Sequence, residues 1–84
     1  MVQRIREHIR VGVIHGPGNK LRPVWFDWQR RKHEVREVTY HWRHRTGNEL
    51  FLYYSVTDGT ALYELVYNTA EQTWILESMD AEKL

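Results

Sequence analysis

Residues 22–38, which read RPVWFDWQRRKHEVREV, decide the fold of this chain. Side chains alternate between the two faces of a β-strand, so Phe26 and Trp28 share one face. Trp25 and Asp27 share the other face. Because a carboxylate is costly to bury, we expect the face of Phe26 and Trp28 to point inward. Trp25 is then left on the outer face.

The rest of the chain repeats this period of two, with turn-forming clusters between the apolar runs. The pattern is typical of an antiparallel all-β domain. We expect six short strands, joined mostly by hairpins, in a meander that curls into a small barrel or half-barrel. The predicted strands cover about His8–His15, Val24–Gln29, His33–Arg43, Leu50–Thr57, Ala61–Tyr67 and Thr73–Met79.

Two local signals refine these strands. The alternation is clean from Val38 to Trp42 but slips just before, so we expect a β-bulge at Arg36–Glu37. The pair Asp58-Gly59 is a strong signal for a two-residue hairpin.

The 84 residues allow one small β domain, residues 1–84. Residues 1–7 fit either a short helical turn or a strand. Residues 80–84 are polar and fit a frayed end or a helical turn, and residues 1–7 also fit a frayed end.

The composition limits the class of protein. Four Trp, five Tyr and two Phe supply large side chains for a small core. With no cysteine, neither a disulfide framework nor a thiolate metal site can form. The chain has no apolar run near the length of a membrane helix, and its start lacks the apolar region of a secretory signal. We therefore expect a cytoplasmic protein without membrane contact.

The charges are divided unevenly along the chain. Residues 1–45 hold eleven of the twelve Lys and Arg against four acids, whereas residues 46–84 hold Lys83 against seven acids. Such asymmetry indicates a nucleic-acid or acidic-partner face, or self-association between copies. The alternative is that basic strands pair with acidic strands within the sheet.

Two sets of residues form the candidate binding surface. The aromatic set is Trp25 with Phe51 and Tyr53, because the parity of the fourth strand separates Phe51 and Tyr53 from Leu52 and Tyr54. The alternative is that the N-terminal segment or the tail covers them. The basic set has the composition of a phosphate contact, although charged turns are commonly just solvated. Its members are Arg30, Arg31, Lys32, Arg43 and Arg45.

The sequence offers no catalytic, cofactor or metal site. His41 and His44 have the spacing H-x-x-H, but residues three apart on a strand point to opposite faces. Ser55 and Ser78 lie within predicted strands, without a nucleophile-elbow motif. We therefore expect that the protein is not an enzyme.

Several segments carry a resemblance across most of the chain. They are Pro23-Val-Trp-Phe26-Asp-Trp28, Val35-Arg-Glu-Val38, His41-Trp42-Arg43, Tyr63-Glu64-Leu65 and Trp74-Ile-Leu76. In these elements the chain resembles a family of small bacterial all-β proteins of unknown function. Some of them are encoded near components of lesion-bypass DNA synthesis, so the resemblance implies an accessory role in DNA repair.

Two positions depart from the pattern of that family. Arg30 stands where the family tends to have glycine, so a tight turn with positive φ is disfavoured and we expect a wider loop. His33 stands where the family tends to have an aromatic residue. Both changes add basic character to one loop.

These observations lead to a binding module as the expected function. An exposed strand edge, or the face of Trp25, Phe51 and Tyr53, would contact a protein partner. The alternative is single-stranded nucleic acid, bound through the basic turns and an outward aromatic side chain. We expect a monomer or a weak homo-oligomer.

Overall fold

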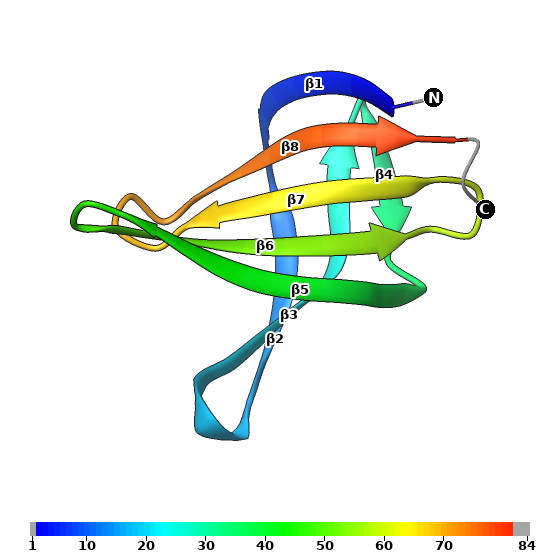
Figure 1. The fold of residues 1–84 in the computed structure, drawn as a ribbon. Helices are drawn as coiled ribbons and strands as arrows, with labels where there is room; N and C mark the ends of the chain where they lie inside the picture. Colours follow the sequence, from blue (N-terminus) through cyan, green and yellow to red (C-terminus); the bar gives the residue numbers. More distant parts are fainter. Residues whose placement is uncertain (1, 82–84) are drawn as a thin grey trace.

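The computed structural model describes residues 2–81, which form eight antiparallel strands in two sheets (Figure 1). The larger sheet has the order β1-β8-β7-β6-β5 and the smaller one the order β2-β3-β4. A short 3₁₀ turn, Pro17–Asn19, joins β2 to β3. The strands are β1 Val2–Ile9, β2 Val11–Gly16, β3 Lys20–Trp28, β4 Arg31–Glu34, β5 Glu37–Thr46, β6 Glu49–Thr57, β7 Leu62–Asn68 and β8 Thr73–Asp80.

The core lies between the two sheets. Figure 1 shows the strands of the smaller sheet running across those of the larger sheet. Phe26 and Trp28 of β3 point into this space, as the alternation predicts, and Phe26 is completely buried. The larger sheet contributes the alternate residues of β6, β7 and β8. The buried cluster comprises Phe26, Trp28, Tyr54, Val56, Ala61, Tyr63, Leu65, Trp74 and Leu76.

The chain passes between the sheets at two corners. The first is Arg10, between β1 and β2, where the Asp27 backbone N–H donates to the Arg10 carbonyl at 2.9 Å. The Arg10 guanidinium also contacts the Asp27 carboxylate, with Nη2 to Oδ2 at 2.6 Å. The second corner is residues 35–36, where the Arg36 N–H donates to the Thr57 carbonyl at 2.8 Å. At each corner, therefore, a backbone group that leaves the hydrogen-bond ladder of one sheet finds a hydrogen-bond partner on a nearby strand.

The all-β antiparallel class is confirmed, but the predicted six-stranded barrel is wrong. Strands β5 to β8 form a meander, as expected. Within residues 2–81, however, β1 and β5 are the two edges of the larger sheet and do not pair with each other, so no barrel closes. The predicted strands His8–His15 and His33–Arg43 are each broken in two, because a chain that changes sheets must interrupt its ladder of hydrogen bonds.

The N-terminal segment is a strand rather than a helical turn or a frayed end. Residues 2–9 form β1, which pairs with β8 from Val2 opposite Asp80 to Ile9 opposite Trp74. Asp80 is also part of β8. Of the ends that we expected to fray, residues 1 and 82–84 lie outside the described residues.

The predicted bulge in the third strand lies at a different place. Residues 35–36 are the corner between the sheets, and the bulge comes later, between Val38 and Tyr40 of β5. Val38 consequently packs against the core. Tyr40 and Trp42, which were grouped with Val38 by simple alternation, are turned to the other face.

The hairpin at Asp58-Gly59 is longer than predicted. Thr57 pairs with Leu62, so the loop has four residues rather than two. The Asp58 carboxylate accepts the N–H groups of Thr60 and Ala61 at 2.9 and 3.1 Å, which is a side-chain-stabilised turn. Gly59 adopts φ 99°, a conformation that favours glycine.

The turn between β3 and β4 is tighter than predicted. Trp28 pairs with Arg31, so only Gln29 and Arg30 connect the strands. Their φ angles are 54° and 60°, the pattern of a type I′ turn without glycine. The wide loop expected from Arg30 is therefore wrong. Pairing of the flanking strands imposes a left-handed conformation that arginine by itself disfavours.

The backbone strain at Gln29 and Arg30 can be tested by replacing them with the residues that a type I′ turn prefers. The double change Gln29→Asn with Arg30→Gly should stabilise the domain by about 1 kcal/mol, because left-handed φ costs these residues less. Urea unfolding would measure the difference. The control Arg30→Ala removes the same charge but keeps a Cβ, and it should change stability by less than about 0.5 kcal/mol. A destabilised double variant would contradict the turn geometry.

Candidate functional site

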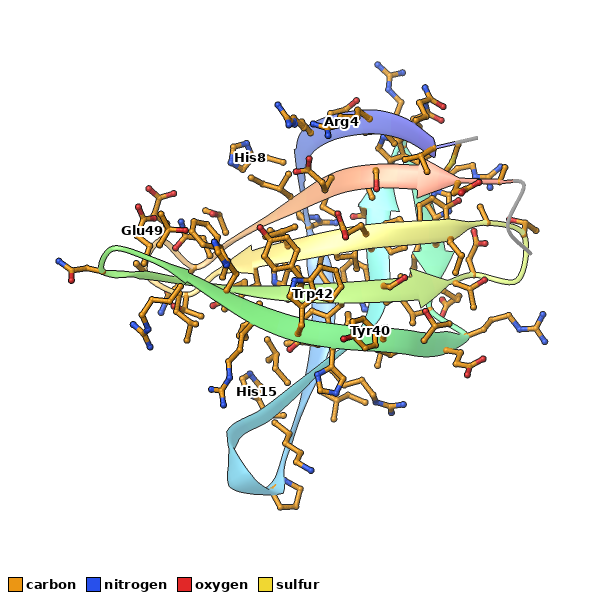
Figure 2. The ribbon with its side chains drawn as sticks, in the orientation of Figure 1. Arg4, His8, His15, Tyr40, Trp42 and Glu49 are labelled. Atoms are coloured by element: carbon orange, nitrogen blue, oxygen red, sulfur yellow. The ribbon has the colours of Figure 1, made fainter. Side chains whose placement is uncertain are left out.

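Three aromatic side chains lie together on the face of the larger sheet that points away from the core. This outer aromatic cluster consists of Tyr40 and Trp42 of β5 and Tyr53 of β6. The rings of Trp42 and Tyr53 are stacked, with centroids 4.8 Å apart and an interplanar angle of 11°. The ring centroids of Tyr40 and Trp42 are 5.4 Å apart, and Tyr40 is 64% exposed. Figure 2 shows Tyr40 and Trp42 on the near side of the sheet, clear of the smaller sheet.

The register of the larger sheet explains this cluster. One row of cross-strand neighbours crosses the sheet from Trp42 through Tyr53, Val66 and Ile75 to His8. Cross-strand neighbours on one face lie close enough for side chains to pack. Val66 is only 7% exposed although it faces away from the core, so its neighbours on this face cover it. The row therefore forms a thin apolar layer, with aromatic rings at the β5 edge.

Acidic groups lie on the same outer face. Glu64 of β7 pairs with Ser55, one row from Tyr53. Burial raises the pKa of Glu64, and the nearby charge of Glu77 raises it further, while Arg4 lowers it. Arg6 contacts Glu77, with Nε to Oε2 at 3.1 Å. This face is therefore a mixed surface, apolar in the middle and with paired acidic and basic groups towards β8 and β1.

The predicted aromatic surface is divided between the two sheets. Phe51 and Tyr53 are two residues apart on β6 and share the outer face of the larger sheet. The β1 strand lies at the opposite edge and does not cover them. Trp25 lies on the outer face of the smaller sheet, with the core between it and Tyr53.

Trp25 has neighbours of its own. It pairs with Gly12, where a Cβ would overlap the indole ring, so glycine is needed for this close approach. Lys32 lies over the ring, with Nζ 5.3 Å from its centroid, as in a cation–π contact. A surface that joins Trp25 to Phe51 and Tyr53 is therefore not formed.

The predicted basic residues also fall into separate places. Arg30–Lys32 form the turn and the start of β4 in the smaller sheet. Arg43 and Arg45 lie near the β5–β6 hairpin, which Figure 1 shows far from the β3–β4 turn. On β5 they pair with Leu52 and Leu50, so they point to the face opposite Trp42. The two basic groups do not make one surface.

The two histidines of the H-x-x-H spacing point to opposite faces, as predicted. His41 pairs with the inward-facing Tyr54, and His44 pairs with the outward-facing Phe51. Among residues 2–81 no group of three or more His, Cys, Asp or Glu side chains is placed to hold a metal ion.

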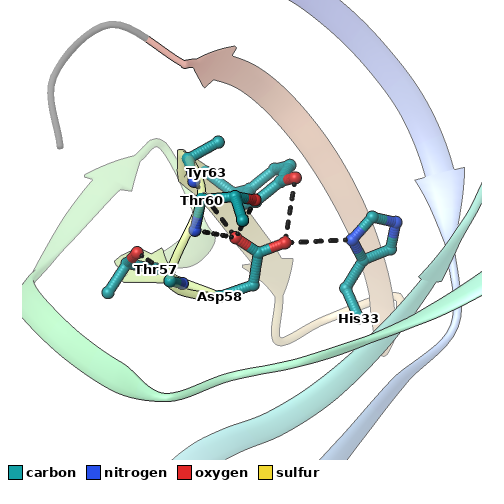
Figure 3. A network of polar contacts seen from close by, with 7 residues as sticks. His33, Thr57, Asp58, Thr60 and Tyr63 are labelled. Atoms are coloured by element: carbon teal, nitrogen blue, oxygen red, sulfur yellow. Dashed lines mark hydrogen bonds and ion pairs between the residues drawn. The ribbon is translucent and has the colours of Figure 1, made fainter.

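Sequence reasoning missed a buried polar network, which Figure 3 shows. Nδ1 of His33, on β4, lies 3.3 Å from Oδ2 of Asp58, and the Tyr63 hydroxyl donates to the same oxygen at 3.2 Å. The His33 ring stacks on Phe26, with centroids 4.9 Å apart and an interplanar angle of 6°. The network links the smaller sheet to the β6–β7 loop of the larger sheet. His33 and Tyr63 are 25 and 5 residues away from Asp58 in sequence, so no local motif predicts the network.

The Asp58 carboxylate is the charged centre of this network. Burial raises its pKa, but hydrogen bonds from Thr60, His33 and the Ala61 backbone outweigh that effect and lower the pKa from 3.8 to about 2. Burial, together with the negative charge of Asp58, raises the pKa of Tyr63 to about 12. The Tyr63 hydroxyl therefore stays protonated at neutral pH and donates its hydrogen bond. These contacts hold the sheets together.

No protein-family model, curated protein or solved structure matches the chain. The resemblance to a bacterial family therefore stays a prediction. None of the described residues belongs to a helix that is long and apolar enough to cross a membrane.

The Asp58 network predicts a loss of stability in acid. Because the folded-state pKa lies below the unfolded value, the carboxylate stabilises the fold fully above about pH 4. This contribution, about 2 kcal/mol, is lost as the pH falls from about 4 towards about 2. Asp58→Asn should remove that part of the pH dependence, as measured by urea unfolding between pH 2 and pH 7.

A matched change controls for the loss of a charge. Glu34→Gln alters a carboxylate that is 71% exposed and, among residues 2–81, pairs with Lys32 alone, and at pH 7 it should cost less than about 0.5 kcal/mol. At the same pH, Asp58→Asn should cost about 1–3 kcal/mol. Equal effects of the two changes would show that the network does not stabilise the fold.

Proposed function

We propose that the protein is a non-enzymatic module that binds another protein through the outer aromatic cluster. The observation that supports this most is the exposure of Tyr40 beside the stacked pair of Trp42 and Tyr53. Tyrosine and tryptophan are enriched among the residues that contribute most to protein interfaces. A solvent-exposed aromatic group at the edge of a sheet has no role in the core, and it suits a contact surface.

The cluster is also held in place before any partner arrives. Trp42 is fixed by its stack on Tyr53, and Tyr53 is fixed by its place on β6, which is paired on both sides. Less side-chain freedom is then lost on binding. Because β5 pairs with β6 alone among the described strands, its other edge offers backbone groups to an added strand. A partner segment on β5 would lie directly beside Tyr40 and Trp42.

The charges favour a protein over a nucleic acid. The charges of Glu64 and Glu77 are balanced by Arg4 and Arg6, so these groups supply no net positive charge to attract phosphates near the cluster. Arg43 and Arg45, which would attract phosphates, project from the opposite face of β5. Single-stranded nucleic acid, and with it an accessory role in DNA repair, is therefore the second candidate. Its support is the resemblance together with the basic turns.

Peptide selection tests the protein-binding proposal. Peptides would be selected from a random display library on the purified protein, and their affinity measured by fluorescence anisotropy. The double change Tyr40→Thr with Trp42→Thr, which keeps good strand formers, should weaken the best peptides by at least about tenfold. The control Ile14→Thr alters an apolar side chain that is 50% exposed on the smaller sheet, and it should leave the affinity unchanged.

Two results would contradict the proposal. One is that the selected peptides bind the double variant as well as the unmodified protein. The other comes from amide-NMR titration with a short single-stranded DNA at low and physiological salt. Shifts at Arg30–Lys32 and Arg43–Arg45 that shrink with salt would favour nucleic acid as the partner.

A further inference from the structure

A cavity of about 270 Å³ opens between the β2–β3 hairpin and the inner face of the larger sheet. It lies on the opposite side of the sheet from the outer aromatic cluster and is separate from the proposed protein contact. Its lining combines apolar and aromatic side chains with one histidine. The lining residues are Val13, His15, Leu21, Leu52, Tyr67 and Trp74.

The cavity follows from the unequal size of the two sheets. Three strands cover only part of the inner face of five strands, and the hairpin of β2 and β3 extends past the core (Figure 1). The Tyr54 hydroxyl donates to the Leu21 carbonyl at 3.0 Å and anchors the hairpin to the larger sheet. The wall and the floor of the cavity are therefore fixed to each other.

The floor is a row of side chains across the larger sheet. Trp74, Tyr67 and Leu52 are direct cross-strand neighbours. The rings of Tyr67 and Trp74 lie 4.8 Å apart at 36°. Val13 and Leu21 face them from the hairpin. A flat apolar group fits between these two walls, because aromatic rings prefer offset or tilted contacts with other rings.

A cationic side chain lies at the end of this row. Arg43 pairs with Leu52 and points to the same face of the sheet. Its side chain makes no ion pair or hydrogen bond with the rest of residues 2–81. His15 lines the cavity from the hairpin, and Figure 2 shows it at the side of β2. No carboxylate is among the lining residues. An apolar slot with a guanidinium at its edge that is unpaired within residues 2–81 is complementary to an apolar anion.

We propose that this cavity binds a small aromatic carboxylate. The ring lies on Trp74, Tyr67 and Leu52, and the carboxylate points towards Arg43. The volume lies just below the usual range for small-molecule pockets, so it suits a ligand of only one or two fused rings. An extended peptide is a poorer match, since it needs a row of pockets along a strand.

The probe for this proposal is 2-naphthoate, titrated into the full chain and followed by amide NMR. Saturable shifts are expected at the lining residues of β2, β6, β7 and β8. The neutral analogue 2-naphthalenemethanol should bind about tenfold more weakly, because it lacks the charge-assisted contact. Absence of saturation at millimolar 2-naphthoate, or saturable shifts centred elsewhere, would overturn the proposal.

Two arginine variants separate the specific contact from general charge. Arg43→Gln should weaken the binding of 2-naphthoate by about tenfold and leave the affinity for 2-naphthalenemethanol unchanged. The control Arg22→Gln removes the same charge from β3, where Arg22 pairs with the exposed Ile14, and it should leave both affinities unchanged. If both variants weakened the binding of 2-naphthoate equally, the loss would come from the change in net charge, and the proposed contact with Arg43 would be wrong.

Discussion

The rest of the structure depends on the packing of β3 across the inner face of the larger sheet. Phe26 is the centre of this contact, since it is completely buried, stacks on His33 and meets Tyr63 edge to face at 4.9 Å. Burial of one such side chain contributes about 1.5–3 kcal/mol, a large share for a domain without a disulfide. The Asp58 carboxylate reinforces the same junction from the β6–β7 loop.

This junction also leaves part of the larger sheet uncovered. Strand β4 has only four residues, so the smaller sheet covers one end of the core and not the other. At the uncovered end, Leu52 and Tyr67 remain half-buried and line the inter-sheet cavity. A small domain buries a smaller fraction of its surface than a large one. Here part of the apolar surface that stays accessible lies at this one end of the larger sheet. The cavity is thus a consequence of the strand lengths.

The two sides of β5 have different surroundings. One side carries Tyr40 and Trp42 on the outer face of the sheet, and the other carries Arg43 and Arg45 on the face of Leu52, which lines the cavity. The bulge after Val38 decides which side chains lie on which face, because it sets the residues of β5 that point outward. The charge asymmetry of the sequence is therefore spread over several surfaces. Pairing of basic β1 with acidic β8, where Arg6 contacts Glu77, accounts for part of it.

The period of two in the sequence determined the all-β class and the inward face of Phe26 and Trp28, because alternation is a local property of each strand. Only the tertiary structure decided where the chain changes sheets, and hence the outward turn of Trp42. It also decided the contact between His33 and Asp58. The physical reason is that a corner or a bulge costs little locally, and its position is set by which distant strands pair and which side chains fill the shared core.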